Sequence, residues 1–341
     1  MNLHAAAVVL AFALAAAPAV PPPEDSVLLT PELRAGVDRG IAFLAAHQNR
    51  DGSFGLGSRD RDAHVGVTAI AGLALLAGGH VPGGADPLGA AARRAIEAVV
   101  AATDAKTGLI VTERTRSQPM YSHAFGTLLL AEASGMTGDA DLGPPLRRAI
   151  DLIVASQNAE GGWRYYPGSK DADLSVSVCQ VMALRAARNA GVAVPIETIE
   201  RASAYVVACF DARDRAFRYQ AGRGHVSFHL TAAAVTALNG LGLASRPEIE
   251  SAFPTIAASF PGGSKKVAGH FLYGQYYALQ AAYFRGDETF RPWYARVRDR
   301  LLAEQRPDGA FDEAAVGDLY GTAMALVILQ LPYHFLPILT R

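Results

Sequence analysis

The stretch QNAEGGW at residues 157–163 decides the fold, because it returns along the chain. QNRDGSF at 48–54 and QRPDGAF at 305–311 repeat its order of Gln, two residues, an acid, Gly, a small residue and an aromatic. Weaker copies lie between them: 104–110 keeps the glycine, 211–217 keeps the aromatic, and 260–263 keeps only the turn. The six turns recur with a period of roughly 46 to 56 residues, which is typical of a repeat architecture.

Each repeat predicts two helices, one on either side of the turn. The stretch that ends at the Gln carries Arg and Glu at three- and four-residue spacing, which is typical of an amphipathic outer helix; examples are 33–47, 146–156 and 293–304. The stretch after the turn has few charges, which is typical of a buried helix; these are 65–77, 125–132, 176–184, 231–241, 276–283 and 322–331. Six such pairs, without the polar capping repeats of an open solenoid, predict an all-α fold: a single (α/α)6 toroid of two concentric helix rings.

The motif itself has a structural role in this prediction. Its glycine supplies the positive φ that ends a helix, and its aromatic side chain fills the gap between neighbouring hairpins. The Gln is expected to bond backbone groups left unpaired at the adjacent helix end.

The N-terminus differs from the repeats. Residues 5–19 are almost wholly apolar and are followed by Pro21-Pro22-Pro23. An apolar run of this length with small residues at 17–19 is typical of a signal peptide. We therefore expect a signal peptide at 1–19, a linker at 20–30 and one toroid domain at 31–341, in a secreted or periplasmic protein; an uncleaved membrane anchor is the alternative.

Charge and cysteine content narrow the function. The net charge is −1 and no run of Lys or Arg exceeds two residues, which excludes the basic surface of a nucleic-acid-binding protein. Cys179 and Cys209 lie in apolar helical stretches and are expected to be small buried thiols. The sequence has no CxxC or HExxH spacing, so we expect neither zinc nor another cofactor.

The segment 157–163 resembles the QW motif of the squalene-hopene and oxidosqualene cyclases, whose superfamily includes the β subunits of the protein prenyltransferases. The resemblance covers nearly the whole chain after the signal segment and implies the same α/α toroid. The cyclases usually have two α-domains, whereas this chain supplies one ring. The prenyltransferase β subunits bind zinc partly through an Asp-x-Cys pair, which this chain lacks.

A second part of the resemblance concerns acid catalysis. Class II cyclases carry Asp-x-Asp-Asp-Thr after a similar Gly-Gly-Trp segment, and its middle acid protonates the substrate. This chain has Asp171, Asp173, Leu174 and Ser175 at the corresponding positions, so the resemblance implies Asp173 as the catalytic acid and Asp171 as the first acid of the motif. Because Asp173 opens a buried helix, an N-cap role with Ser175 beside it explains the residue equally well.

Polar residues also gather where the other buried helices begin. In a toroid these starts surround one mouth of the cavity, and their partial positive charge favours an anionic or oxygen-rich ligand. The candidate ligand-binding residues are His64, Tyr121, His123, Ser175, His225, His229, His270, Tyr273, Tyr276, Asp318 and Tyr320.

Three functions fit these patterns. The first is an exported isoprenoid-handling enzyme, related to terpenoid cyclases and prenyltransferases, with acid catalysis at the mouth. The second is a glycan lyase or hydrolase, for which Asp173 and Asp318 are the pair of carboxylates that hydrolysis needs. The third is a non-catalytic toroid that binds a small molecule, a polymer or a protein. The buried stretches contain few aromatic residues, which disfavours carbocation chemistry, and assembly with further copies of the chain stays open.

Overall fold

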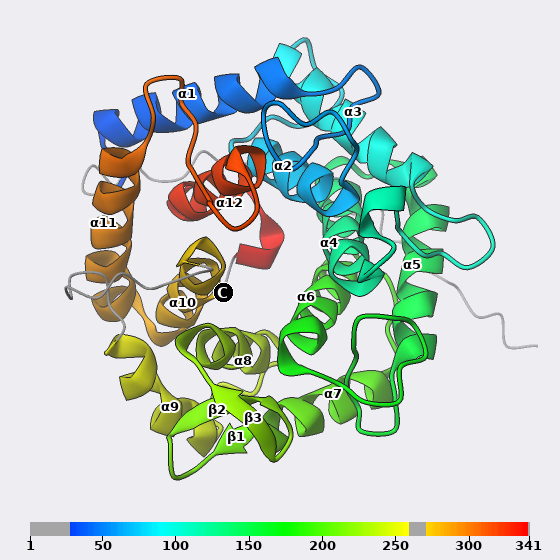
Figure 1. The fold of residues 1–341 in the computed structure, drawn as a ribbon, viewed down its shortest axis with the longest axis vertical. Helices are drawn as coiled ribbons and strands as arrows, with labels where there is room; N and C mark the ends of the chain where they lie inside the picture. Colours follow the sequence, from blue (N-terminus) through cyan, green and yellow to red (C-terminus); the bar gives the residue numbers. More distant parts are fainter. Residues whose placement is uncertain (1–27, 259–270, 340–341) are drawn as a thin grey trace, which may run out of the picture.

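The computed structural model describes residues 28–258 and 271–339. In this part of the chain twelve α-helices form two concentric rings, as predicted (Figure 1). The outer helices are α1 (Pro31–His47), α3 (Pro87–Ala101), α5 (Gly143–Ser156), α7 (Ile196–Ala208), α9 (Pro247–Ala257) and α11 (Asp287–Glu304). The inner helices are α2 (Val65–Ala77), α4 (Pro119–Thr137), α6 (Leu174–Asn189), α8 (Phe228–Gly240), α10 (Phe271–Arg285) and α12 (Asp318–Leu329).

The inner ring closes on itself. Each inner helix contacts the next in chain order, and α12 returns to contact α2. Every residue of α2 is buried, because this helix packs against other helices on all sides. The prediction of an all-α (α/α)6 toroid is thus confirmed. The expected signal peptide and most of the linker lie outside the described residues.

The Gln of each clear motif copy ties one outer helix to the next. Its side-chain amide donates to a carbonyl inside the following outer helix: Gln48 to Ala91 at 2.9 Å, and Gln157 to Thr198 at 2.9 Å. Gln305 donates to Gly36 of α1 at 2.8 Å and so joins the last repeat to the first. The acceptor therefore lies inside the adjacent outer helix, and not at its unpaired end as the sequence predicted.

The aromatic of the motif is tied to the inner helix by a repeated hydrogen bond. The backbone N–H of Trp163 donates to the Ser177 hydroxyl at 2.9 Å. Phe54 donates in the same way to Thr68, Phe217 to Thr231 and Phe311 to Thr322. This bond fixes where each inner helix starts relative to its turn, and so sets the residues that surround the mouth.

The structure adds elements that the sequence analysis did not predict. A three-stranded antiparallel sheet lies between α7 and α8 and consists of β1 (Phe210–Asp211), β2 (Ala216–Gln220) and β3 (Arg223–Val226). It occupies the place of a degenerate motif copy, where Arg215 takes a positive φ of 51°. Four 3-10 helices are present as well: η1 (Glu113–Thr115), η2 (Ala140–Leu142), η3 (Leu331–Tyr333) and η4 (Pro337–Leu339).

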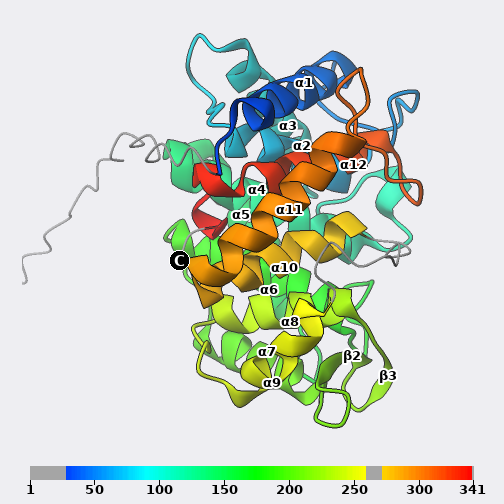
Figure 2. The same cartoon turned by 90° about the vertical axis from the view of Figure 1, so that its left-hand side faces the viewer.

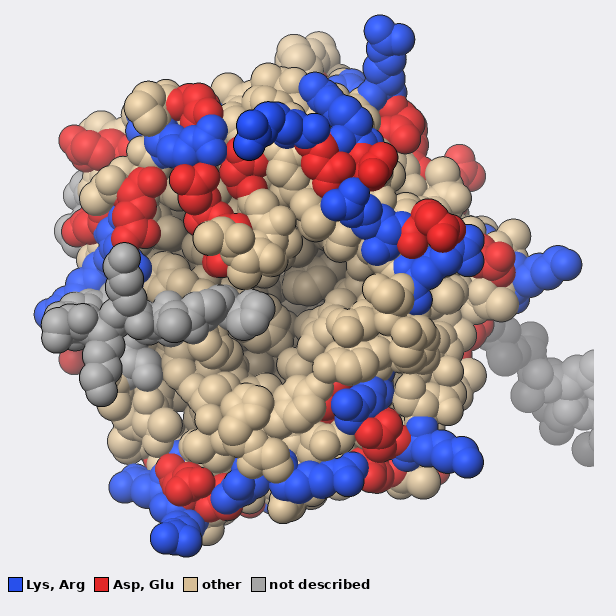
Figure 3. Space-filling model, in the orientation of Figure 1, with Lys and Arg blue, Asp and Glu red and all other residues tan. Residues whose placement is uncertain are grey.

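The two faces of the ring differ. The motif turns and the β-strands lie on the face turned toward the viewer in Figure 1, and η3 and η4 lie on the opposite side, as the rotated view shows (Figure 2). Since α2, α4, α6, α8 and α12 each follow a motif turn on the first face, their N-termini surround this face, which we call the mouth. A hollow opens at its centre, and the visible atoms around it are mostly uncharged (Figure 3).

Candidate functional site

Asp173 lies at the mouth as the N-cap of α6, in a register that other repeats share. Its Oδ1 accepts the backbone N–H of Val176 at 2.9 Å. His64 caps α2 in the same way, through its Nδ1 and the N–H of Val67, and Ser227 caps α8. The capping role proposed as the alternative for Asp173 is therefore present in the structure.

Capping uses only one oxygen of this carboxyl group. The Ser175 hydroxyl also donates to Oδ1, at 2.7 Å. The side chain is fully buried, and Oδ2 has no hydrogen-bond partner within the described residues. A buried polar atom without a partner costs free energy that a cap does not require. Oδ2 is therefore a feature of Asp173 that its structural role leaves unexplained.

Burial raises the pKa of the Asp173 carboxyl above its ordinary range. The Val176 N–H, the Ser175 hydroxyl and the Arg164 guanidinium offset part of this effect, because they stabilise the charged form. The Tyr219 hydroxyl is near enough to act in the same direction, but its geometry gives no hydrogen bond to Oδ2. The pKa of Asp173 is thus closer to neutral than that of an exposed aspartate, while donors remain in place to stabilise the carboxylate anion. This combination suits a general acid.

Two tyrosines from different repeats meet beside the loop that carries Asp173. Tyr165 follows Trp163 in the motif turn, and its hydroxyl lies 2.5 Å from that of Tyr219 in β2. Arg164 places its guanidinium over both rings, at 5.1 and 5.9 Å from their centroids. Gln220, beside Tyr219, donates to the carbonyl of Ala172 at 2.8 Å. The strand therefore holds the loop that carries the acid.

Tyr121 and Ser175 extend the polar contacts of Asp173 toward α4. The Tyr121 hydroxyl lies 2.8 Å from the Ser175 hydroxyl, which in turn donates to Asp173. Three of the predicted site residues thus form one hydrogen-bonded chain across two inner helices. Asp171 is not part of it: its carboxylate pairs with Arg164 at 2.6 Å and its side chain is 46% exposed.

His123 has a structural role that the sequence analysis did not assign. Its Nδ1 accepts the N–H of Ile110 at 3.1 Å, so it occupies the place that Ser177 and Thr68 hold in other repeats. Its Nε2 contacts the carbonyl of Ala149 at 3.1 Å, and the ring is fully buried. Both nitrogens are committed to the backbone, which leaves none for a ligand.

Asp318 lies on α12, opposite α6 in the inner ring. Its carboxylate accepts the backbone N–H of Ser58 at 2.6 Å, the Ser58 hydroxyl at 2.8 Å and Arg306 at 3.2 Å. Burial raises the pKa of Asp318, but the Ser58 and Arg306 contacts outweigh burial and the net pKa is lowered. Asp318 therefore anchors the loop at 58 to α12, and both of its oxygens are in use.

The remaining predicted residues are spread around the mouth. His225 is exposed on β3 and stacks on Tyr219, with 5.8 Å between the ring centroids, and His229 packs edge-on against Phe228. Tyr273 and Tyr276 are on the first turns of α10, where the Tyr273 hydroxyl is buried without a partner among the described residues. Tyr320 donates its backbone N–H to Leu56 at 3.3 Å, and His270 lies outside the described residues.

Sequence reasoning missed several residues at the mouth. Arg164 and Tyr165 directly follow the motif tryptophan, and this adjacency was the available signal. Tyr219 belongs to an unpredicted strand, so no helical pattern pointed to it. Cys179 and Tyr277 were assigned to helix interiors, and their contact depends on the tertiary structure.

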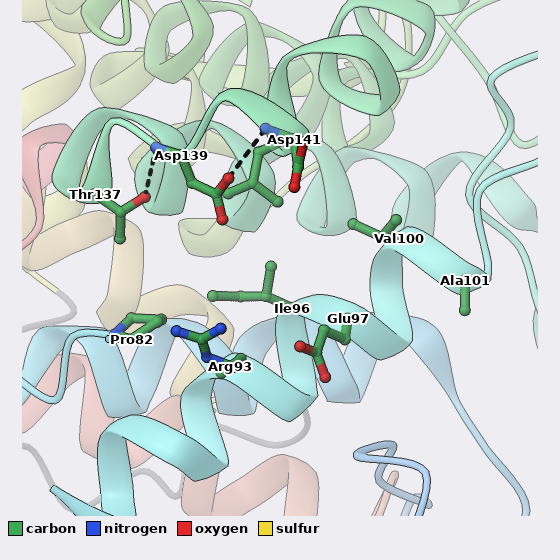
Figure 4. A pocket seen from close by; sticks show the side chains of 10 residues that line it. Pro82, Arg93, Ile96, Glu97, Val100, Ala101, Thr137, Asp139 and Asp141 are labelled. Carbon is green, nitrogen blue, oxygen red and sulfur yellow. Dashed lines mark hydrogen bonds between the residues drawn. The ribbon is translucent and has the colours of Figure 1, made fainter. Parts of the chain in front are cut away.

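A separate pocket of about 350 Å³ lies on the outer surface, between α3 and η2 (Figure 4). Arg93, Glu97, Asp139 and Asp141 line it. Two of these residues serve the turn: Asp139 donates its N–H to Thr137 at 3.2 Å and accepts that of Asp141 at 3.0 Å. The pocket is remote from the mouth and offers no comparable arrangement of acid and donors.

Among residues 28–258 and 271–339, no group of three or more His, Cys, Asp or Glu side chains is placed to hold a metal ion. In the same ranges, no helix has both the length and the apolar composition needed to cross a bilayer.

Comparison with known proteins supports the fold and goes no further. No family model matches the sequence. No curated protein matches it either. Among solved structures, the chain is similar to an α-1,6-mannanase of Salegentibacter in complex with α-1,6-mannotriose, with a TM-score of 0.66 and 9% identity over 89% of this chain and 99% of that one.

A type II terpene cyclase from Scytonema, in complex with geranylgeranyl dihydroxybenzoate, is similar with a TM-score of 0.62 and 17% identity over 89% of this chain and 98% of that one. A protein from Actinoplanes is similar with a TM-score of 0.56 and 16% identity over 87% of this chain and 98% of that one. The (α/α)6 toroid is thus supported, and these low identities show the fold alone.

Proposed function

We propose that the protein is an enzyme that acts on isoprenoid compounds, with Asp173 as the general acid at the mouth of the toroid. The observation that carries this proposal is the Oδ2 atom of Asp173, which is buried and unpartnered although a helix cap needs only Oδ1. The similarity to a terpene cyclase of the same fold adds support.

The geometry suggests how the proton would be held and delivered. Because Val176 and Ser175 both donate to Oδ1, a proton on the carboxyl group resides on Oδ2. Transfer of that proton to a substrate alkene forms a C–H bond and leaves a carbocation on the substrate and a carboxylate on Asp173. The two donors and Arg164 stabilise this carboxylate. Loss of a proton from the rearranged cation restores the acid, so the overall reaction is an isomerisation.

Access to Oδ2 requires a movement at the mouth. Asp173 is fully buried, so the substrate meets the acid only when side chains near it, such as Tyr219, move aside. When these side chains close again, they exclude water and so protect the carbocation.

The surroundings suit an apolar substrate better than their composition suggested. The inner helices have few aromatic residues overall, but Tyr121, Phe125, Tyr273, Tyr277 and Tyr320 all lie on α4, α10 and α12 in the half nearest the mouth. Aromatic faces stabilise cations. The half of the ring nearest the mouth therefore has aromatic side chains that could stabilise a carbocation, although the inner helices as a whole have few.

Glycan hydrolysis is the second candidate, because the mannanase shares the fold. Inactive variants of that enzyme replace two consecutive aspartates, and this chain contains no two consecutive aspartates. The alternative pair, Asp173 and Asp318, has one member whose oxygens are held by Ser58 and Arg306. The isoprenoid proposal therefore fits these residues better.

The test compares the wild type with Asp173→Asn and Asp173→Ser on squalene, prenyl diphosphates, α-1,6-mannan and acidic polysaccharides. Both substitutions keep an N-cap, since Ser227 caps α8 in the same register, so both variants should fold with near-native thermal midpoints. Product analysis should show turnover of an isoprenoid by the wild type and at least about a hundredfold loss in both variants. Equal turnover by all three proteins would show that Asp173 is only a cap, and turnover of a polysaccharide alone would establish the hydrolase.

We also propose that the protein is exported, on the strength of the apolar segment at 5–19. N-terminal sequencing of protein from its native host checks this: a first residue near 20 is expected, and an intact residue 1 on cytoplasmic protein would contradict it.

A further inference from the structure

Two buried side chains meet although their inner helices are not neighbours in the ring. Cys179 is on α6 and Tyr277 is on α10, and α8 lies between these helices in the inner ring. The Tyr277 hydroxyl nevertheless lies 3.7 Å from the Cys179 sulfur, and the two side chains are 1% and 4% exposed. A contact between inner helices that are two places apart in the ring lies on the central side of the helix between them, so this pair narrows the central space at its level.

The space beside this contact is too narrow for a ligand. It is bounded by α4, α6 and α10, through side chains such as Phe125, Met182 and Tyr276. The gaps between these side chains add up to about 190 Å³, but none of them is wide enough to admit a water molecule. The middle of the ring is therefore packed like a protein core.

The end opposite the mouth is closed by the C-terminal segment. η3 contacts α12, and η4 contacts α4 and α6. The backbone N–H of Ile338 donates to the Glu132 carboxylate at 3.2 Å, and Leu336 and Ile338 are buried. Within the described residues the central space thus opens only toward the mouth.

We propose that the contact between Cys179 and Tyr277 is the floor of the substrate chamber and restricts the substrate to a short prenyl chain. This inference rests on the proposed function and narrows its substrate class. The chamber is the space between the mouth and this floor, with Asp173, Ser175 and Tyr121 at its upper wall. Tyr277 is then a specificity-determining residue.

The depth of the chamber sets the length of the chain. Cys179 follows Leu174, the first residue of α6, by five positions, which is about 7.5 Å along a helix. An extended carbon chain advances about 1.2 Å per bond, as a protein backbone does. The main chain of a geranyl group therefore spans about 8 Å and that of a geranylgeranyl group about 18 Å. The first nearly matches the depth of the floor, whereas the second is more than twice as long and must fold back or pass through it.

The experiment measures the binding of geraniol, farnesol and geranylgeraniol to the full chain by equilibrium dialysis with labelled alcohols. The proteins are the wild type, Tyr277→Ala, the milder Tyr277→Leu in case the first variant is unstable, and Tyr205→Ala as the control. Tyr205 is as buried as Tyr277 but belongs to the outer helix α7. It therefore reports the general effect of removing a buried tyrosine.

The wild type should bind geraniol at least about tenfold more tightly than geranylgeraniol, since a pocket that is too short rejects the extra groups. Tyr277→Ala and Tyr277→Leu should shift this ratio by about tenfold toward geranylgeraniol, and Tyr205→Ala should leave it unchanged. Equal binding of the three alcohols by the wild type, or an unchanged ratio in both Tyr277 variants, would overturn the proposal.

The same measurements separate this proposal from the proposed function. If geraniol binds with the expected preference but no prenyl compound is turned over, the chamber stands and the catalytic role fails. If a long prenyl compound is bound and turned over by the wild type, the catalytic role stands and the floor fails. If no alcohol binds to any of the proteins, both are wrong.

Discussion

Substitution of Gly161 by alanine tests the packing of the motif turn against the next repeat. Gly161 has a φ of +89°, and a Cβ at this position would overlap the carbonyl oxygen of Arg201 on α7 and lie 2.9 Å from its carbonyl carbon. The left-handed conformation costs a non-glycine residue about 1–2 kcal/mol. The overlap with a rigid backbone carbonyl adds about 1–3 kcal/mol. Gly161→Ala should therefore destabilise the fold by about 2–5 kcal/mol.

Gly168→Ala is the matched control in the same loop. Gly168 also has a positive φ, +75°, but a Cβ there meets nothing within 4 Å. It should cost only the conformational part, about 1–2 kcal/mol. Urea denaturation followed by circular dichroism gives both values, provided that the denaturant slopes agree. Equal losses in the two variants would refute the idea that the motif glycine is needed for close approach between repeats.

Three further predictions concern buried titratable groups. Burial raises the pKa of Glu132 to about 8, so the contribution of this group to stability is full below its ordinary pKa and is lost as the pH rises through 8. The thermal midpoint of Glu132→Gln should therefore rise relative to that of the wild type between pH 5 and 9. A constant difference between the two midpoints would contradict this. Burial lowers the pKa of His123 to about 4, so its contribution is present above about 6.5 and lost as the pH falls through 4; His123→Thr, with the residue type of Thr68, should unfold at a less pH-dependent urea concentration between pH 7 and 4. Ser175→Ala removes a donor that lowers the pKa of Asp173, so the alkaline limb of the pH–rate profile should move to higher pH, and an unmoved limb would exclude Asp173 as the acid.

The sequence was sufficient to predict the repeats and the ring. Three motif copies fix the turns, and the alternation of charged and uncharged stretches assigns outer and inner helices; α2 begins and ends at the predicted residues. Such patterns are local, since each turn and helix depends on residues within one repeat or its neighbour. The unpredicted sheet arose where the motif had decayed and no helical pattern replaced it.

The site was predicted only in its location. Helix starts follow from the pattern, so Asp173, Ser175 and Tyr121 could be placed near the starts of buried helices, and their roles in a site stay predictions. The pattern could not show that His123 replaces a repeated Ser or Thr. The bond from Ile110 to His123 is recognised only by comparison with the equivalent bonds to Ser or Thr in the other repeats. Nor could it show that Ser58 and Arg306 hold Asp318, since Ser58 lies 260 residues away in sequence.

The sequence by itself therefore determined that this chain forms a toroid and where most of its buried helices begin. Only the tertiary structure decided that Oδ2 of Asp173 has no hydrogen-bond partner within the described residues, and that Tyr277 on α10 meets Cys179 on α6. The physical reason is that periodicity records the contacts between neighbouring repeats. Contacts across the ring depend on the radius at which six repeats close and on the rotation of each inner helix, and no single repeat encodes either quantity.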